Sequence, residues 1–117
     1  MRAFVVEKIG DKEFKSGIQD ISTPKCGENE IVIKVTYSSL NYKDALSSVG
    51  NPGVTRNFPH TTGIDVAGTV YESTSSVFKV GERVLVTGYD MGMNTNGGHA
   101  QFVKVPAAWV ARIPYSI

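Results

Sequence analysis

Cysteine is almost missing from this 117-residue chain. Cys26 stands alone, so no disulfide can form within the chain, and a structural zinc site of four thiolates is excluded. His60 and His99 lie far from Cys26 and from each other in the sequence, and we expect both to be surface or strand histidines rather than ligands. The sequence therefore predicts no metal site and suits the reducing cytoplasm.

Long apolar runs and an excess of one charge are also lacking. Four consecutive apolar residues, 3–6, precede Glu7, which is too few for the core of a signal peptide, and no segment approaches membrane-spanning length. Lys and Arg number 12 and Asp and Glu number 11, which gives no reason to expect nucleic acid or a membrane as a partner. With 41% apolar residues, the chain has the composition of one ordinary globular domain.

The sequence has no glycine-rich phosphate loop of the kind found in dinucleotide-binding folds. No strand–helix–strand rhythm recurs along the chain, and the pair Gly97-Gly98 lacks a third glycine and precedes a predicted strand rather than a helix. We therefore expect no doubly wound nucleotide-binding (Rossmann) domain in residues 1–117.

Short strands dominate what is present. The alternation of apolar and polar residues is clearest over 30–38, and further strands are expected at 3–7, 13–21, 63–72, 83–87, 99–105 and 109–113. Residues 41–49 are the best helix candidate, which Gly50-Asn51-Pro52-Gly53 would end. This pattern predicts a mainly β domain, a small and partly open barrel with one or two short helices.

Three segments, taken together, resemble one family. They are residues 27–46 (GENEIVIKVTYSSLNYKDAL), residues 57–70 (NFPHTTGIDVAGTV) and residues 78–106, which begin FKVGERVLVTG and end NGGHAQFVKVP. In this order and spacing they are similar to the GroES-like domain of medium-chain dehydrogenases/reductases, in the zinc-free branch of quinone oxidoreductases and acrylyl-CoA reductases. The resemblance implies that residues 1–117 form the N-terminal, substrate-side domain of such an enzyme.

The positions of the zinc ligands in related enzymes carry other residues here. Zinc-dependent members of the family hold their metal through a cysteine at the helix start and a Gly-His-Glu segment. This chain has Asn41 at the first position and Gly63-Ile64-Asp65 at the second, and isoleucine has no metal-binding atom. The residue before that glycine, commonly proline in relatives, is Thr62. The resemblance therefore implies a reaction without zinc.

The implied reaction is hydride transfer from NADPH to a small molecule. The resemblance implies an acceptor with an activated C=C bond, such as acrylyl-CoA, another enoyl-CoA or an enone, or else a quinone. Without a metal, hydrogen-bond donors must stabilise the enolate oxygen, each contributing about 2.7–4 kcal/mol. The α-carbon then takes a proton from solvent or from an acid. The complete enzyme is expected to be a homodimer.

The candidate catalytic residues lie at the start of the predicted helix. The resemblance implies that Asn41 and Tyr42 are donors beside the nicotinamide, with Tyr42 also contacting the cofactor, and both side chains are uncharged at neutral pH. The residues alone leave alternatives open, because Asn41 could cap the helix and Tyr42 could be a packing aromatic. Asp44, the third candidate, is an orienter of the cleft, a partner for an arginine in the part of the enzyme beyond this sequence, or a first-turn carboxylate favoured by the helix dipole.

Two further positions carry predictions. Gly97 and Gly98 resemble the pair at which the backbone approaches the cofactor in this family, although a hairpin that needs positive φ explains them equally well. Asp65 interrupts an apolar strand, where a carboxylate needs hydrogen-bond partners, so a structural role is expected for it.

Complete members of the family carry a Rossmann domain after this one, and their chain then returns to finish the first domain. The present sequence ends at Ile117, where the resemblance places the seam between the two domains. We therefore expect the 117-residue chain to show no turnover alone, and its uncovered surface to favour self-association. The alternative from another functional class is a free-standing small β-barrel, a binding or scaffold module such as a co-chaperonin-like ring subunit.

Overall fold

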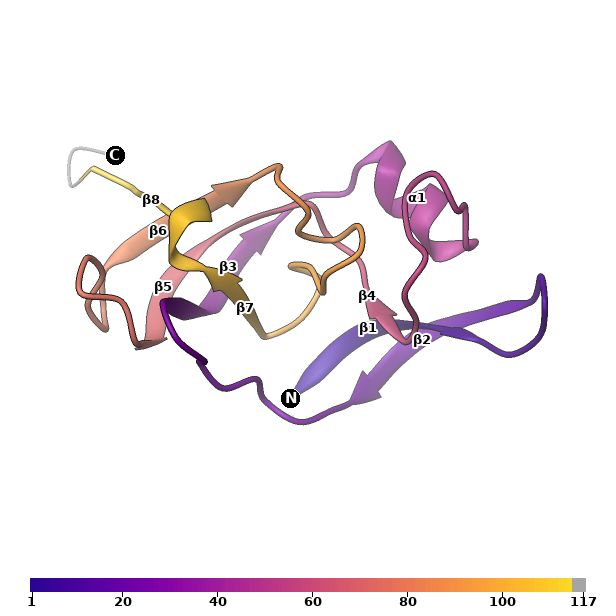
Figure 1. Ribbon diagram of the computed structural model, residues 1–117, viewed down its shortest axis with the longest axis horizontal. Helices are drawn as coiled ribbons and strands as arrows, with labels where there is room; N and C mark the ends of the chain where they lie inside the picture. Colours follow the sequence, from indigo (N-terminus) through magenta and orange to yellow (C-terminus); the bar gives the residue numbers. More distant parts are fainter. Residues whose placement is uncertain (115–117) are drawn as a thin grey trace.

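The computed structural model describes residues 1–114 and confirms a mainly β domain. Within these residues, eight strands form two open sheets, and one α-helix stands beside the smaller sheet (Figure 1). The molecule is elongated, with principal extents of 45 × 25 × 21 Å. The sheets do not close on themselves, so the barrel predicted from the sequence is an open one.

The larger sheet has the strand order β7-β3-β5-β6-β8, and all its neighbouring strands are antiparallel. Its strands are β3 (Glu30–Ser38), β5 (Asp65–Ser73), β6 (Arg83–Thr87), β7 (Phe102–Pro106) and β8 (Ala111–Arg112). Strand β3 coincides with the predicted strand 30–38, but its burial does not simply alternate, because Ile31, Val32 and Ile33 are all fully buried. Successive side chains on a strand point to opposite faces, so β3 is covered on both faces at its start.

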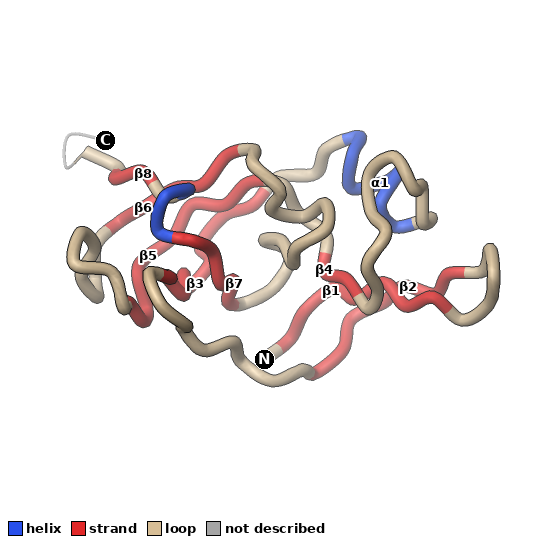
Figure 2. The backbone as a smooth tube through the Cα atoms, in the orientation of Figure 1, coloured by secondary structure: helices blue, strands red, loops and turns tan. Residues whose placement is uncertain are grey.

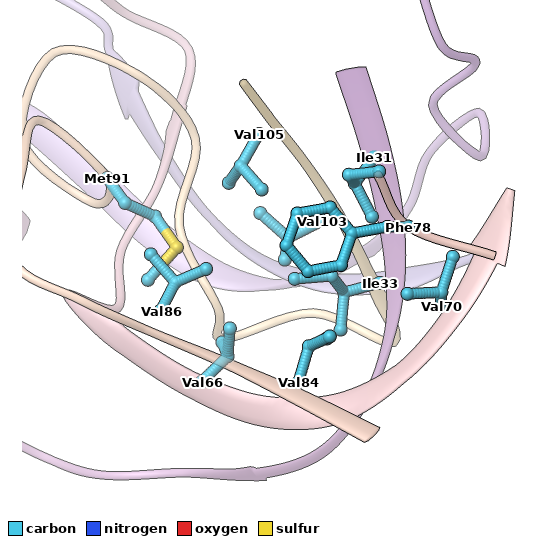
Figure 3. Packing of buried hydrophobic residues seen from close by; sticks show 10 residues of the cluster. All are labelled: Ile31, Ile33, Val66, Val70, Phe78, Val84, Val86, Met91, Val103 and Val105. Carbon is cyan, nitrogen blue, oxygen red and sulfur yellow. The ribbon is translucent and has the colours of Figure 1, made fainter. Parts of the chain in front are cut away.

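The main hydrophobic core lies on one face of the larger sheet (Figure 3). Branched aliphatic side chains from β3, β5, β6 and β7 supply most of it, and two residues from loops, Phe78 and Met91, complete it. The cluster consists of Ile31, Ile33, Val66, Val70, Phe78, Val84, Val86, Met91, Val103 and Val105. β-branched residues pack well on a pleated surface, which explains why this valine-rich sequence forms a sheet.

The smaller sheet has the order β2-β1-β4. Strands β1 (Arg2–Lys8) and β2 (Phe14–Asp20) form a hairpin, and β4 (His60–Thr61) pairs with the other edge of β1. Strand β4 was not predicted, since two residues are too few to show a period. It brings the segment before Gly63 against β1.

Residues 99–101 join the two sheets. The N–H of Phe4 donates to the carbonyl of His99 at 2.8 Å, and the N–H of Val35 donates to the carbonyl of Gln101 at 2.9 Å. The predicted strand 99–105 is therefore observed only as β7, which begins at Phe102. Residues 99–101 precede it and form hydrogen bonds with β1 as well as with β3. Figure 2 shows that the chain between β6 and β7 is mostly loop.

The helix is the one predicted. Helix α1 (Tyr42–Ser48) begins after its N-cap residue Asn41 and ends at its C-cap Val49, and Gly50 follows with φ +75°. A short 3₁₀ helix, η1 (Ala107–Trp109), replaces the start of the predicted strand 109–113. Within residues 1–114, no helix is long and apolar enough to span a membrane.

Candidate functional site

The start of α1 is fixed by reciprocal capping. Asn41 has extended backbone angles and is the N-cap residue, and Asp44 stands at the third helical position. The Oδ2 atom of Asp44 accepts the N–H of Asn41 at 2.8 Å, as in a capping box. The capping alternative for Asn41 is therefore confirmed, while a catalytic role stays a prediction.

Asp44 ties this helix to the loop before β5. Its Oδ1 atom accepts the N–H of Gly63 at 3.1 Å, and the carboxylate is almost fully buried. Its Oδ2 atom also lies 3.8 Å from the Nε2 atom of His99. Two backbone N–H groups thus compensate the desolvation of this carboxylate. Asp44 is both a first-turn carboxylate and an orienter of neighbouring segments.

His99 belongs to the site, although the sequence suggested a surface or strand position. Its side chain is 14% exposed and lies in the bend before β7. Its Nε2 atom donates to the carbonyl of Ser39 at 2.9 Å, so in the neutral ring Nδ1 accepts the hydroxyl of Thr62 at 2.7 Å. The expectation of a surface or strand position was wrong for His99. Ser39 and Thr62, which lie 60 and 37 positions away in the sequence, bind the two ring nitrogens and enclose the ring.

Asp65 has the hydrogen-bond partners that its strand position demands. Its Oδ1 atom accepts the hydroxyl of Ser39 at 2.7 Å and the N–H of the same residue at 3.1 Å. The Nδ2 atom of Asn41 donates to the Ser39 hydroxyl at 2.9 Å and lies 3.4 Å from Oδ2 of Asp65. The structural role expected of Asp65 is therefore confirmed, and the amide of Asn41 is held by this network.

Tyr42 points away from the protein. Its side chain is 79% exposed, and the preceding Leu40 is 87% exposed. The alternative that Tyr42 is a packing aromatic is therefore wrong for residues 1–114. An exposed phenol next to a fixed amide remains available to a ligand.

Gly97 and Gly98 are glycines because backbones meet there. Neither has a positive φ, so the hairpin interpretation is wrong. A Cβ atom on Gly97 would lie 2.1 Å from the carbonyl oxygen of Gly63, and one on Gly98 would lie 2.0 Å from Cγ1 of Val66. Both residues are buried, and their cofactor-binding role stays a prediction.

A hollow of about 420 Å³ is lined by some of the predicted site residues but not by others. Most of its surface is apolar, and its lining includes Phe4, Leu40, Asn41, Asp44, Thr62 and His99. Of the predicted site residues, Asn41 and Asp44 line it, whereas Tyr42, Gly97 and Gly98 do not. Sequence reasoning missed Thr62 as a site residue; the signal was its replacement of the proline common in the family.

Cys26 and His60 lie apart from this hollow. Burial and the neighbouring Glu72 raise the pKa of the Cys26 thiol, which makes it a poor nucleophile at neutral pH. His60 is buried in β4, so the strand expectation is confirmed for it and the surface one is not. Within residues 1–114, no three His, Cys, Asp or Glu side chains are grouped closely enough to hold a metal ion.

The buried side chain of His60 should make the free energy of unfolding depend on pH. Burial lowers its pKa below the ordinary 6.5 and outweighs the opposing effect of the hydrogen bond that Nε2 donates to the carbonyl of Gly92 at 3.0 Å, so the folded state favours the neutral ring. The unfolded chain binds the extra proton below about pH 6.5, so the free energy of unfolding falls as the pH drops from 6.5 toward the lowered pKa. Urea unfolding between pH 7.5 and 5 should show a slope from this group of up to about 1.4 kcal/mol per pH unit.

The control for this pH dependence is His60→Gln, which keeps an amide donor and does not titrate. The variant should show a shallower loss of stability between pH 6.5 and 5, whatever its stability at pH 7.5. His99 is present in both proteins, so its contribution cancels in the difference. Parallel pH profiles of the two proteins would contradict the assignment.

Residues 27–115 match the family described as the alcohol dehydrogenase GroES-like domain. The chain is 38% identical over 117 residues to "Probable acrylyl-CoA reductase AcuI" of Escherichia coli (strain K12), covering 100% of this chain and 36% of the relative. It is 34% identical over 116 residues to "Putative quinone oxidoreductase YhfP" of Bacillus subtilis (strain 168), covering 99% and 35%.

A solved structure shares the fold. The crystal structure of Escherichia coli K-12 YhdH with bound NADPH superposes with a TM-score of 0.88 at 36% identity, covering 98% of this chain and 35% of that one. The chain thus spans about a third of the length of the relatives it matches.

Proposed function

Since the chain belongs to the alcohol dehydrogenase GroES-like domain family, as its motifs indicated, we propose that it forms the substrate-side domain of an NADPH-dependent oxidoreductase. The proposed reaction is zinc-free hydride transfer to the activated C=C bond of an enoyl-CoA, such as acrylyl-CoA, or an enone, or to a quinone. The observation that carries the proposal is the mainly apolar hollow with Asn41 at its edge, in a chain related to reductases of both kinds. We also propose a cytoplasmic location and a homodimeric complete enzyme.

The residues around the hollow fit the nicotinamide end of NADPH. An uncharged ring needs an apolar surface and neutral polar neighbours, and here the carboxylate of Asp44 is already bound by two backbone N–H groups. When bound, the reduced nicotinamide supplies a hydride. We assign the cofactor contacts to Tyr42 and to the backbone at Gly97 and Gly98, none of which lines the hollow itself.

Asn41 and Tyr42 are the proposed catalytic residues. As the substrate gains a hydride at its β-carbon, the π electrons of the C=C bond move toward the carbonyl, and negative charge develops on the carbonyl oxygen. Neutral N–H and O–H donors stabilise this charge. Ser39 holds one N–H of the Asn41 amide at 2.9 Å, and we assign the donor role to the second N–H, whose contact with Oδ2 of Asp65 is the longer one at 3.4 Å. Asp44 acts as a positioning residue through the backbone of Asn41.

A domain exchange tests the proposed function. Residues 1–117 would replace the matching third of the Escherichia coli relative, and NADPH oxidation would be followed with acrylyl-CoA, an enone and a quinone. We expect saturable turnover by the chimera and none by the 117-residue chain, because residues 1–114 contain no glycine-rich strand–loop–helix unit for the pyrophosphate. A folded chimera that oxidises NADPH with none of the three acceptors would overturn the proposal.

The same chimera separates the roles of its residues. Tyr42→Phe should lower kcat by about tenfold to a hundredfold with little change in stability, since the ring is exposed and only the O–H donor is lost. Lys43→Gln, one position further along the exposed side of α1, is the matched control and should leave kcat unchanged. Equal effects of the two substitutions would remove Tyr42 from the reaction.

A further inference from the structure

The proposed reaction needs a proton donor for the α-carbon, and the residues assigned so far do not supply one from within the hollow. The amide of Asn41 is not an acid, and both oxygens of Asp44 accept backbone N–H groups, so this carboxyl group is an acceptor. The phenol of Tyr42 is exposed and does not line the hollow. Thr62 and His99 do line it, and both carry exchangeable protons.

Thr62 and His99 are joined by two hydrogen bonds. The backbone N–H of His99 donates to the carbonyl of Thr62 at 2.9 Å, and the Thr62 hydroxyl lies 2.7 Å from Nδ1 of the ring. Thr62 is 1% exposed, so bulk water does not compete for this contact. Ser48, the other hydroxyl of the hollow, instead donates within its own helix, to the carbonyl of Ala45 at 2.8 Å. The hollow therefore has one hydroxyl that is bonded to a titratable side chain.

The direction of the bond between Thr62 and His99 depends on the charge of the ring. In the neutral ring Nε2 donates to the carbonyl of Ser39 at 2.9 Å, and Nδ1 accepts the Thr62 hydroxyl. In the protonated ring both nitrogens are donors, so Nδ1 donates to Oγ1 of Thr62. The hydrogen of the hydroxyl is then released from Nδ1 and can point to a molecule in the hollow. Protonation of His99 thus turns Thr62 into a donor.

A counter-charge lies beside the ring on its other side. Oδ2 of Asp44 is 3.8 Å from Nε2 of His99, and Asp44 is the one charged residue among those that line the hollow. From β5, Asp65 bonds the hydroxyl of Ser39 at 2.7 Å rather than the ring. From β1, Phe4 contributes an apolar side chain to the hollow, and its backbone N–H donates to the carbonyl of His99. The positive charge of the protonated ring therefore faces a carboxylate and no lining cation.

We propose that Thr62 delivers the proton to the α-carbon and that His99 supplies it from behind, so that the two form a proton relay. The enolate electron pair takes the hydroxyl proton: the O–H bond of Thr62 breaks, a C–H bond forms at the α-carbon, and the carbonyl double bond is restored. In the same step the Nδ1–H bond of His99 breaks, and its proton bonds to the Thr62 oxygen. Water later returns a proton to the neutral ring.

Asp44 is the positioning residue of this relay. Its Oδ1 atom accepts the N–H of Gly63, which follows Thr62, and its Oδ2 atom faces His99. One carboxylate therefore fixes both members relative to Asn41, the proposed donor to the carbonyl oxygen. The inference rests on the proposed function and goes beyond it by naming the acid, which general acid catalysis makes worth about a hundredfold or more in rate.

The chimera described above tests the relay through the choice of acceptor. Thr62→Val keeps the shape of the side chain and should lower kcat with acrylyl-CoA or an enone by about a hundredfold. Quinone reduction should stay within about twofold, because hydride transfer leaves that charge on oxygen, which takes a proton from water without a relay. Thr62→Ser keeps the hydroxyl and should keep most of kcat. Thr69→Val, the same change on β5, is the matched control and should change neither reaction.

Chemical rescue tests His99 in the same chimera. His99→Ala should lower kcat for the C=C acceptors, and added imidazole should restore part of it by filling the space of the ring. Pyrazole has nearly the same shape but is a far weaker base, so it should restore nothing. Rescue by both compounds would show that the ring only fills space and would overturn the relay.

A measurement without NADPH tests the hydrogen bonds of the relay. Nitrogen-15 NMR of the 117-residue chain at pH 8 should show the neutral ring of His99 with its proton on Nε2 and with Nδ1 as an acceptor. Thr62→Val should change the Nδ1 shift and leave the Nε2 shift nearly unchanged. A neutral ring with its proton on Nδ1 would contradict the relay, since the Thr62 hydroxyl could not then be bonded to a free lone pair.

The outcomes separate the relay from the reductase. Equal losses with quinone and C=C acceptors in Thr62→Val would show a structural effect and overturn the relay alone. A chimera that reduces only quinones would also leave the reductase standing without the relay. A folded chimera that oxidises NADPH with no acceptor would overturn both.

Discussion

Replacing Gly97 by alanine should lower the free energy of unfolding by about 3 kcal/mol or more. The new Cβ would lie 2.1 Å from the carbonyl oxygen of Gly63, 2.7 Å from Cα of Gly92 and 2.7 Å from the carbonyl oxygen of Thr62. All three are backbone atoms, so no side-chain rotation can relieve the overlap. Urea unfolding at pH 7.5 measures the change, and a domain of this size has only about 5–15 kcal/mol to lose.

Gly17→Ala is the matched control for this substitution. Gly17 lies in β2, has no positive φ, and an added Cβ would meet no atom within 4 Å. This variant should be neutral or slightly more stable, because alanine restricts the unfolded chain without straining the folded one. If Gly97→Ala were as well tolerated as Gly17→Ala, the close approach of the backbones would not be what requires glycine.

Removing the carboxylate of Asp44 should lower the free energy of unfolding by about 2–3 kcal/mol. Asp44→Ala leaves the buried N–H of Gly63 without its acceptor and removes the acceptor of the Asn41 N–H at the helix start. Asp44→Asn keeps one oxygen acceptor, so its loss should be smaller. Urea unfolding measures both variants, and hydrogen exchange at the Gly63 amide should accelerate in Asp44→Ala.

Asp20→Ala serves as the comparison, since Asp20 is an exposed residue at the end of β2. A surface change of this kind alters stability by no more than about 0.5 kcal/mol. If Asp44→Ala also stayed within that range, Asp44 would not be the residue that ties α1 to the loop before β5.

The elements with strong local signals were predicted well. The strand 30–38 and the strand 83–87 have the predicted bounds, and the helix 41–49 differs only by its two cap residues. Each is governed by interactions within a few residues of the chain: alternation, a capping box, and a glycine that stops the helix. Strand β4 and the bend at 99–101 were missed because their pairing with β1 depends on distant partners.

The candidate site was predicted in part for the same reason. Asn41 and Asp44 lie within one helical turn, so sequence spacing places them together. His99 and Thr62 are 37 positions apart, and nothing local shows that the hydroxyl of one meets the ring of the other. The strand assignment of His99 was wrong because residues 99–101 pair with β1 and β7 begins only at Phe102.

By itself, the sequence determined the mainly β class, the short helix, and the family that the segments 27–46, 57–70 and 78–106 indicate, because periodicity, turn residues and motifs are local properties. Only the tertiary structure decided that Gly97 is required by Gly63 rather than by a turn, and that Asp44 holds the loop before β5. Contacts between distant segments depend on how the two sheets meet, which no local pattern encodes.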